Sequence, residues 1–161
     1  MNTFFLFTDG SVDTKSKIGF GAFLFISELA ISHTLAEQNI HLKRFEETSS
    51  SKLELQTLIC ALNSISVDNI KLIVFTDSQN IIGLPGRREK LERNEYLSKN
   101  GKLLDNHDLY RSFFNLIDQR DVTFEKVKGH QRSHQKNKID DLFTLVDRAS
   151  RKALRNEFLA N

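Results

Sequence analysis

The segment FFLFTDGS, residues 4–11, places four consecutive apolar residues directly before a cluster of turn-forming residues. An uninterrupted apolar run is typical of a strand that is buried on both faces of a sheet, and TDGS predicts the turn that ends it. The segment IKLIVFTDS, residues 70–78, repeats this pattern. If the two strands are parallel neighbours, Asp9 and Asp77 emerge together at the carboxyl edge of the sheet, where open α/β sheets bind their ligands.

The segments around these two strands predict a mixed sheet flanked by helices. Long helical crossovers favour parallel pairing of the first, fourth and fifth strands, and short connections favour antiparallel hairpins for the second and third. The fold class is therefore expected to be α/β, with a mixed five-stranded βββαβαβα sheet. The further expected elements are strands at 19–26, 31–38 and 122–127, and helices from Ser51, after Ser78 up to a break at Leu84-Pro85-Gly86, over 103–119 and over 139–158.

Composition limits the class of protein. The chain has 161 residues, of which 39% are hydrophobic and 27% are charged, with a mass of 18.6 kDa and a mean hydropathy of −0.37. These values fit one globular domain spanning residues 1–161 and exclude a membrane span or a collagen-like repeat. The lone Cys60 rules out an internal disulfide. Together with an N-terminus that resembles a strand rather than a signal peptide, it favours the cytoplasm.

Charge is distributed unevenly along the chain. The formal total is +2, but residues 1–84 carry 6 basic and 9 acidic side chains, whereas residues 85–161 carry 17 basic and 12 acidic ones. The basic half is a candidate surface for a polyanion, because clustered charge attracts an oppositely charged partner over long range. An ordinary solvated surface is the alternative interpretation.

The carboxylates that follow the two buried strands indicate a metal site. Two carboxylates held close together repel each other unless a proton or a cation lies between them, and oxygen ligands suit Mg²⁺ or Mn²⁺. The alternative is that Asp9 and Asp77 only cap turns or helices. Glu54 is a third candidate, although Ser51 and Glu54 also fit an S-x-x-E capping box. The sequence is compatible with both roles of Glu54, as a metal ligand and as a capping residue.

The C-terminal segment contains further candidate catalytic residues. Asp140, Asp141 and Asp147 lie on the last expected helix, where Asp140 and Asp147 share one face about 10 Å apart along the axis. Periodicity does not choose between them. His130 lies in VKGH, residues 127–130, where a strand runs into a basic loop. An imidazole there either transfers protons near neutral pH or is simply solvated.

Five motifs occur in the order seen in one enzyme family: TDGS at 8–11, LEL around Glu54, TDSQ at 76–79, VKGH at 127–130 and VDRASRKA at 146–153. In these motifs the chain resembles type 1 ribonuclease H over nearly its whole length. The resemblance implies the ribonuclease H-like fold and an endonuclease that hydrolyses the RNA strand of RNA–DNA hybrids with about two Mg²⁺ or Mn²⁺ ions. It implies four metal-binding carboxylates and a loop histidine that assists product departure, here Asp9, Glu54, Asp77, Asp147 and His130.

The resemblance also implies contacts with the substrate. The expected substrate-binding residues are Thr48, Ser49 and Asn106 for a DNA phosphate, Ser50, Ser51 and Gln79 for the minor groove, and in addition Ser11 of the first motif and Arg87 and Arg88 of the basic half. The expected partner is the RNA–DNA hybrid. Neither a membrane nor a protein partner is expected, and the protein is expected to be a monomer.

The sequence departs from the family pattern in several places, and one is that serines stand where groove-contacting asparagines often precede the family's glutamate. The stretch between His130 and the last carboxylate is longer than usual, and the usual spacing points to Asp140 instead of Asp147. We prefer Asp147 because VDRASRKA matches the helix pattern of the family. The region of the family's basic handle, residues 84–102, has no Trp. Alternative functions are a DNA nuclease of related fold, such as a resolvase or a transposase-like core, or a nucleic-acid-binding module without catalysis.

Overall fold

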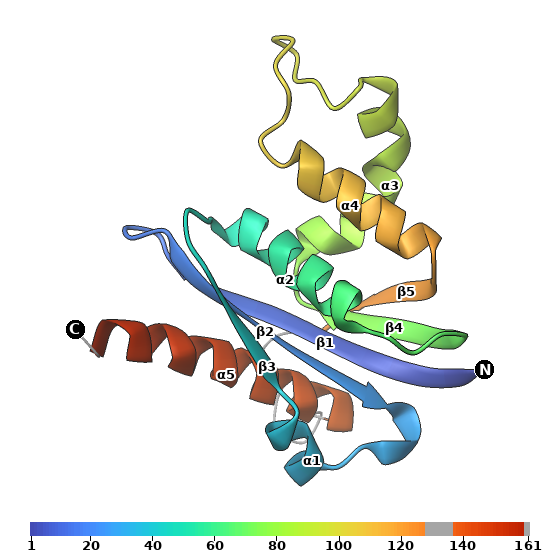
Figure 1. Cartoon of the computed structure of the whole chain (residues 1–161), viewed down its shortest axis with the longest axis vertical. Coiled ribbons are helices and arrows are strands. Elements are labelled where there is room, and N and C mark those ends of the chain that lie inside the picture. Colours follow the sequence, from blue (N-terminus) through green and yellow to red (C-terminus); the bar gives the residue numbers. More distant parts are fainter. Residues whose placement is uncertain (128–136, 160–161) are drawn as a thin grey trace.

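The computed structural model describes residues 1–127 and 137–159, and these residues form a five-stranded sheet (Figure 1). The strands lie in the order β3-β2-β1-β4-β5, which puts β1 at the centre. Their bounds are β1 Asn2–Asp13, β2 Ile18–Ser27, β3 His41–Phe45, β4 Ile70–Thr76 and β5 Asp121–Lys126.

Strand pairing agrees with the expected mixed topology. β1 pairs antiparallel with β2, and β2 pairs antiparallel with β3. β1 pairs parallel with β4, and β4 pairs parallel with β5. The prediction of a parallel first, fourth and fifth strand is confirmed. β1 and β4 run side by side in the same direction. Functional residues near the carboxyl ends of both strands therefore lie at the same edge of the sheet.

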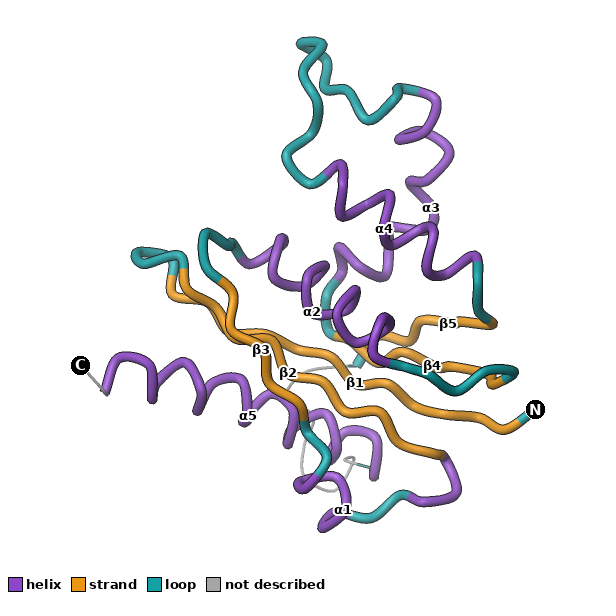
Figure 2. Tube along the Cα trace, in the orientation of Figure 1, coloured by secondary structure: helices purple, strands orange, loops and turns teal. Residues whose placement is uncertain are grey.

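Helices cover both faces of the sheet. α5, Lys138–Leu159, packs on one face, and α2, Ser50–Ser64, packs on the other beside α4, His107–Asp118 (Figure 1). α3, Gln79–Arg93, begins next to the sheet, and its second half and the loop after it stand away from the sheet beyond α4 (Figure 2). In the described ranges, no helix has the length and apolar character needed to cross a membrane.

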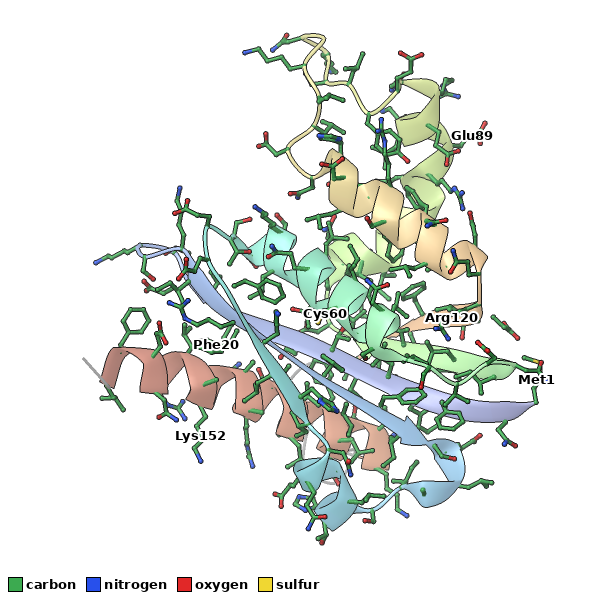
Figure 3. All side chains as sticks on the ribbon, viewed as in Figure 1. Met1, Phe20, Cys60, Glu89, Arg120 and Lys152 are labelled. Atoms are coloured by element: carbon green, nitrogen blue, oxygen red, sulfur yellow. The ribbon has the colours of Figure 1, made fainter. Side chains whose placement is uncertain are left out.

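Each face of the sheet has its own apolar core, because the side chains of a strand alternate between the two faces. In β1, Phe5 and Phe7 point to α5 and pack near Val146, whereas Leu6 points to the side of α2. Full burial of one such side chain contributes about 1.5–3 kcal/mol. On the outer side of α5, Lys152 points away from the sheet into solvent (Figure 3).

The prediction of a strand over residues 31–38 is wrong. The chain instead forms a 3₁₀ turn, Glu28–Ala30, and the helix α1, His33–Gln38, before it enters β3. The hydroxyl of Ser32 accepts a hydrogen bond from the Leu35 N–H at 3.1 Å and so starts the helix. Serine is a preferred N-cap residue, and the segment is too short to show a clear helical period in the sequence.

Helix α3 continues past the expected break at Leu84-Pro85-Gly86 and ends at Arg93. Proline disturbs a helix because it lacks an N–H and crowds the preceding turn, yet Pro85 lies at an exposed position and the helix resumes. The second half of α3 is held by Arg88, which donates two hydrogen bonds of 2.6 and 2.7 Å to the Asp118 carboxylate of α4. Contact with α4 therefore compensates the local disturbance.

Gly21 of β2 lets α2 approach the sheet closely. A Cβ at this position would overlap Oγ1 of Thr57, a buried residue of α2. We expect Gly21→Ala to lower the free energy of unfolding by about 1–3 kcal/mol, the usual cost of overpacking, as measured by urea denaturation.

Gly86→Ala is the control for this substitution. A Cβ at Gly86 meets no atom within 4 Å, and Ala favours a helix over Gly by about 1 kcal/mol, so this variant should be as stable as the wild type or slightly more so. Unchanged stability of Gly21→Ala would contradict the close approach of α2 to β2.

Candidate active site

Strand β1 carries Asp9 past the end of β4. Its parallel pairing with β4 ends at Phe7 with Phe75, and β1 continues to Asp13 paired only with β2. The prediction of a turn at residues 8–11 is therefore wrong, because β2 provides backbone partners for this segment. Asp9 lies inside a strand, at the point where the parallel neighbour of that strand stops.

Asp9 faces α5 and meets Asp147 of that helix. Alternation along β1 puts Asp9 on the same face as Phe7, which is buried beneath α5. A side-chain hydrogen bond joins Asp9 and Asp147 and raises the pKa of Asp9. Two residues further along β1, the hydroxyl oxygens of Ser11 and the buried Ser150 of α5 share a hydrogen bond of 3.1 Å. This second contact holds the helix beside the strand.

Asp77 follows β4 in a short turn that begins α3. The Ser78 N–H donates to Oγ1 of Thr76 at 3.1 Å, and the Ser78 hydroxyl caps α3 by accepting from a backbone N–H at 3.1 Å. Thr76 and Ser78 are both buried. The turn holds the exposed Asp77 close enough to Asp9 and Asp147 for the charges of the three groups to interact.

Glu54 comes to this edge from the opposite face of the sheet. α2 is capped by Ser49, whose hydroxyl accepts from the Lys52 N–H at 3.4 Å. The capping box considered for Ser51 and Glu54 is therefore wrong. One carboxylate oxygen of Glu54 instead accepts a hydrogen bond of 2.6 Å from the Ser78 hydroxyl. This bond ties Glu54 to the turn after β4.

Burial and crowding raise the pKa values of these carboxyl groups. For Asp9, burial is the largest cause, followed by the hydrogen bond to Asp147 and the charge of Asp77, and together they raise its pKa to about 8. Burial raises the pKa of Glu54, although the Ser78 hydroxyl opposes the rise. Asp77 is exposed on one side, yet its partial desolvation and the charge of Asp147 raise its pKa too. Full ionisation is unfavourable here unless a cation balances it.

The donor atoms at this edge fit a divalent metal ion. Mg²⁺ and Mn²⁺ prefer carboxylate oxygens, and a cation would relieve the repulsion acting on Asp9. Within residues 1–127 and 137–159, no three His, Cys, Asp or Glu side chains already converge as the ligands of one ion. Asp147 instead bonds Asp9 and pairs with Nε of Arg151 at 3.0 Å. Binding an ion therefore requires these carboxylates to turn towards it.

Asp140 lies at the start of α5, about 10 Å along the helix axis from Asp147. Its N–H donates to Oδ1 of Asn137 at 3.0 Å, and its carboxylate accepts from the Asn137 N–H at 3.4 Å. Reciprocal bonds of this kind cap a helix. Asp147, and not Asp140, contacts Asp9, while the metal-binding role of Asp147 stays a prediction.

The residues expected to bind a DNA phosphate and the minor groove have separate local roles. Thr48 is buried, and its hydroxyl donates to Oε1 of Gln56 at 2.7 Å. Ser50 and Ser51 are exposed in the first turn of α2. Asn106 is the N-cap residue of α4, but its side chain makes no capping hydrogen bond. The exposed serines and the amide of Asn106 are thus the better placed of these groups to meet a ligand.

The two arginines expected to bind phosphate differ in their contacts. Arg88 pairs with Asp118, as described above, and its guanidinium lies 4.9 Å from the ring centre of Phe114. Arg87 is exposed, donates to Oδ1 of Asn80 at 2.7 Å and lies 5.9 Å from the ring centre of Tyr110. Arg88 therefore joins α3 to α4, and Arg87 is the more available of the two for a phosphate.

Three residues at this edge make contacts that the sequence analysis missed. Ser78 and Ser150 bond expected site residues, and the ammonium of Lys126 donates to Oε1 of Gln79 at 2.9 Å. Ser78 belongs to the TDSQ motif, so the motif could have identified it as a site residue. Nothing in the β5 sequence distinguishes Lys126 from an ordinary solvated lysine. His130 lies outside the described residues.

A mixed five-stranded sheet with carboxylates gathered where the parallel pairing of β1 with β4 ends defines the class of ribonuclease H-like nucleases. The family model RNase H matches residues 1–150, and the chain belongs to the ribonuclease H family. Its enzyme class is ribonuclease H, a nucleic-acid-binding hydrolase.

Known proteins are similar to this chain over most of its length. Ribonuclease H of Prosthecochloris aestuarii is 27% identical over 141 residues, which cover 85% of this chain and 90% of the relative. The RNase H domain of prototype foamy virus has a TM-score of 0.70 at 15% identity, covering 94% of this chain and 92% of that one. A foamy viral protease–reverse transcriptase in complex with an RNA/DNA hybrid has a TM-score of 0.62 at 10% identity, covering 94% and 19%.

The raised pKa of Asp9 predicts how stability changes with pH when divalent ions are removed by EDTA. The pKa of Asp9 is 3.8 without its surroundings and about 8 in the fold, so between these values the folded chain binds more protons than the unfolded chain. The free energy of unfolding should therefore fall as pH rises from about 5 to about 8, by at most about 1.4 kcal/mol per pH unit.

Asp9→Asn should remove much of this fall and be more stable than the wild type at pH 8, as measured by urea denaturation at both ends of the range. Asp140→Asn, which changes a carboxylate away from the cluster, should keep the wild-type dependence. The same pH dependence in Asp9→Asn and the wild type would show that Asp9 is not the group that holds the extra proton.

Proposed function

We propose that this chain is an endonuclease that hydrolyses the RNA strand of RNA–DNA hybrids with two divalent ions, Mg²⁺ or Mn²⁺, held by Asp9, Glu54, Asp77 and Asp147. The observation that carries the proposal is the meeting of Asp9, Asp77 and Asp147 from three elements at one edge of the sheet. Membership of the ribonuclease H family supports it. The foamy viral enzyme solved with a hybrid supports the choice of substrate.

In this mechanism, the protein positions the reacting groups. The bound ions would supply the positive charge that activates a water for attack and stabilises the leaving oxygen. The contact between Ser11 and Ser150 keeps Asp147 facing Asp9. The Ser78 hydroxyl orients the carboxylate of Glu54 by its bond of 2.6 Å, and His130 would move a proton as the product leaves.

The acidic edge is the edge of the sheet that carries Asp9, Glu54, Asp77 and Asp147. Groups on both sides of it would bind the substrate. We propose that Thr48, Ser49 and Asn106 hold a phosphate of the DNA strand, with Arg87, and to a lesser extent Arg88, adding charge to this contact. The short side chains of Ser11, Ser50 and Ser51 and the amide of Gln79 would read the minor groove, where 2′-hydroxyl groups distinguish RNA from DNA.

The chain would act as a monomeric single domain in the cytoplasm, where the lone Cys60 stays reduced. A DNA nuclease of related fold would share the carboxylates but cleave a DNA duplex. A binding module without catalysis would bind the hybrid and leave it intact.

Cleavage of a labelled RNA–DNA hybrid in the presence of Mg²⁺, beside a DNA duplex of the same sequence, tests the proposed function. The wild type should cut the RNA strand and leave the duplex intact. Asp147→Ala should lower turnover by at least about 10²-fold, because it removes a carboxylate from the site of charge development. Asp140→Ala should keep turnover near the wild-type value and lose about 1 kcal/mol of stability as a weakened helix cap.

Thermal unfolding of both variants provides the folding control. If Asp140→Ala is inactive and Asp147→Ala is active, the assignment of the fourth carboxylate is wrong. If the wild type cuts the DNA duplex as fast as the hybrid, the related-fold DNA nuclease is the better account. Tight binding of the hybrid without any metal-dependent cleavage would favour the non-catalytic module.

A further inference from the structure

Lys126 ends β5 beside the acidic edge. It pairs with Thr76, the last residue of β4, which directly precedes Asp77 in the chain. The pairing continues one residue further, where the Val127 N–H donates to the carbonyl of Thr76 at 2.8 Å. Strand pairing with β4 therefore fixes the backbone at Lys126 and at the next residue, while the side chain of Lys126 is exposed.

The ammonium of Lys126 reaches from β5 to the turn that carries Asp77. It donates to Oε1 of Gln79 at 2.9 Å, and its charge is one of those that lower the pKa of Asp77 against the effect of burial. A lysine ammonium has three donors, and the bond to Gln79 uses one of them. Within residues 1–127 and 137–159 no second acceptor bonds this ammonium, so its other donors can meet acceptors of a ligand.

Lys126 differs in its partners from other cations of this protein. Arg151, the other cation whose charge acts on Asp77, is paired with the Asp147 carboxylate at 3.0 Å, and Arg88 is paired with Asp118. Among the residues that the structure describes, no carboxylate forms a salt bridge with Lys126. Its ammonium is thus oriented by Gln79 and acts on the charge of Asp77 without being held in a salt bridge by any described carboxylate.

We propose that Lys126 binds a phosphate of the RNA strand next to the bond that is cleaved, and that Gln79 orients its ammonium for this contact. The inference rests on the proposed function: Lys126 pairs with Thr76, the residue before Asp77, so a scissile phosphate bound over Asp77 would have its neighbours in the same strand near Lys126. A fixed charge here offsets part of the repulsion between the phosphate backbone and the carboxylates. A lysine acts on a phosphate as a point charge, so the contact is mainly electrostatic.

The test measures affinity for the hybrid as a function of salt, in a chain that also carries Asp9→Asn so that the RNA stays uncut. Losing one phosphate contact lowers the slope of log affinity against log salt by about one unit. The ratio of the parent chain's affinity to that of Lys126→Met should therefore be about 3.5-fold smaller at about 200 mM salt than at about 50 mM salt. Lys126→Gln should behave in the same way, and Lys126→Arg should restore the slope.

Lys71→Met is the matched control. Lys71 is an exposed lysine of β4 that pairs with Asp121 at the opposite end of the sheet, so its replacement removes the same charge away from the acidic edge. Its salt slope should equal that of the parent chain. Equal thermal midpoints of the variants at positions 71 and 126 establish that folding is unaffected.

A hybrid with one uncharged methylphosphonate linkage locates the contact. Placed in the RNA strand next to the cleavage site, the neutral linkage should abolish the difference between Lys126→Met and its parent. Placed in the DNA strand, it should leave that difference unchanged. The opposite result would assign Lys126 to the DNA strand and overturn the proposal.

Two further outcomes would also overturn it. An unchanged salt slope in Lys126→Met would mean that the lysine is only solvated. Equal, salt-independent deficits in Lys126→Met and Gln79→Ala would mean that the lysine acts only by holding Gln79. Cleavage of the hybrid by the chain with native Asp9 is measured separately, so failure of the lysine contact is distinguishable from failure of the proposed function.

Discussion

The repulsion between carboxyl groups that the fold forces together at one edge of the sheet is the interaction on which the account of this protein depends. Burial, the side-chain hydrogen bond with Asp147 and the charge of Asp77 raise the pKa of Asp9 to about 8. Such an arrangement opposes folding unless a proton or a cation compensates it. The rest of the structure supplies the contacts that keep these groups in place.

Both layers of helices contribute to that placement. On one face, the hydrogen bond between Ser11 and Ser150 keeps α5 beside β1, so that Asp147 stays opposite Asp9. On the other face, Gly10 leaves room for Leu53 of α2, since a Cβ at Gly10 would lie 2.8 Å from a methyl carbon of that leucine. Leu53 directly precedes Glu54, so the close approach of α2 to β1 brings Glu54 to the same edge.

Much of this arrangement could be predicted from sequence because it rests on two repeated apolar runs, each followed by an aspartate. The pairing of β1 with β4 and the closeness of Asp9 to Asp77 follow from that pattern. The helix at α1 could not be predicted in the same way, because six residues are too few for a clear period and the cap by Ser32 is a local contact. The contact of Lys126 with Gln79 was equally invisible, since it depends on strand register.

The central claim is that the acidic edge binds divalent cations, and the thermal midpoint at pH 8 as a function of Mg²⁺ concentration tests it most directly. A ligand that binds only the folded chain stabilises it by RT ln(1 + [L]/Kd). The account predicts a midpoint that rises with Mg²⁺ in the wild type and rises much less in a chain carrying both Asp9→Asn and Asp77→Asn. It also predicts no comparable rise with KCl at equal ionic strength. Equal shifts with MgCl₂ and KCl, or equal Mg²⁺ shifts in both chains, would contradict a metal site at this edge.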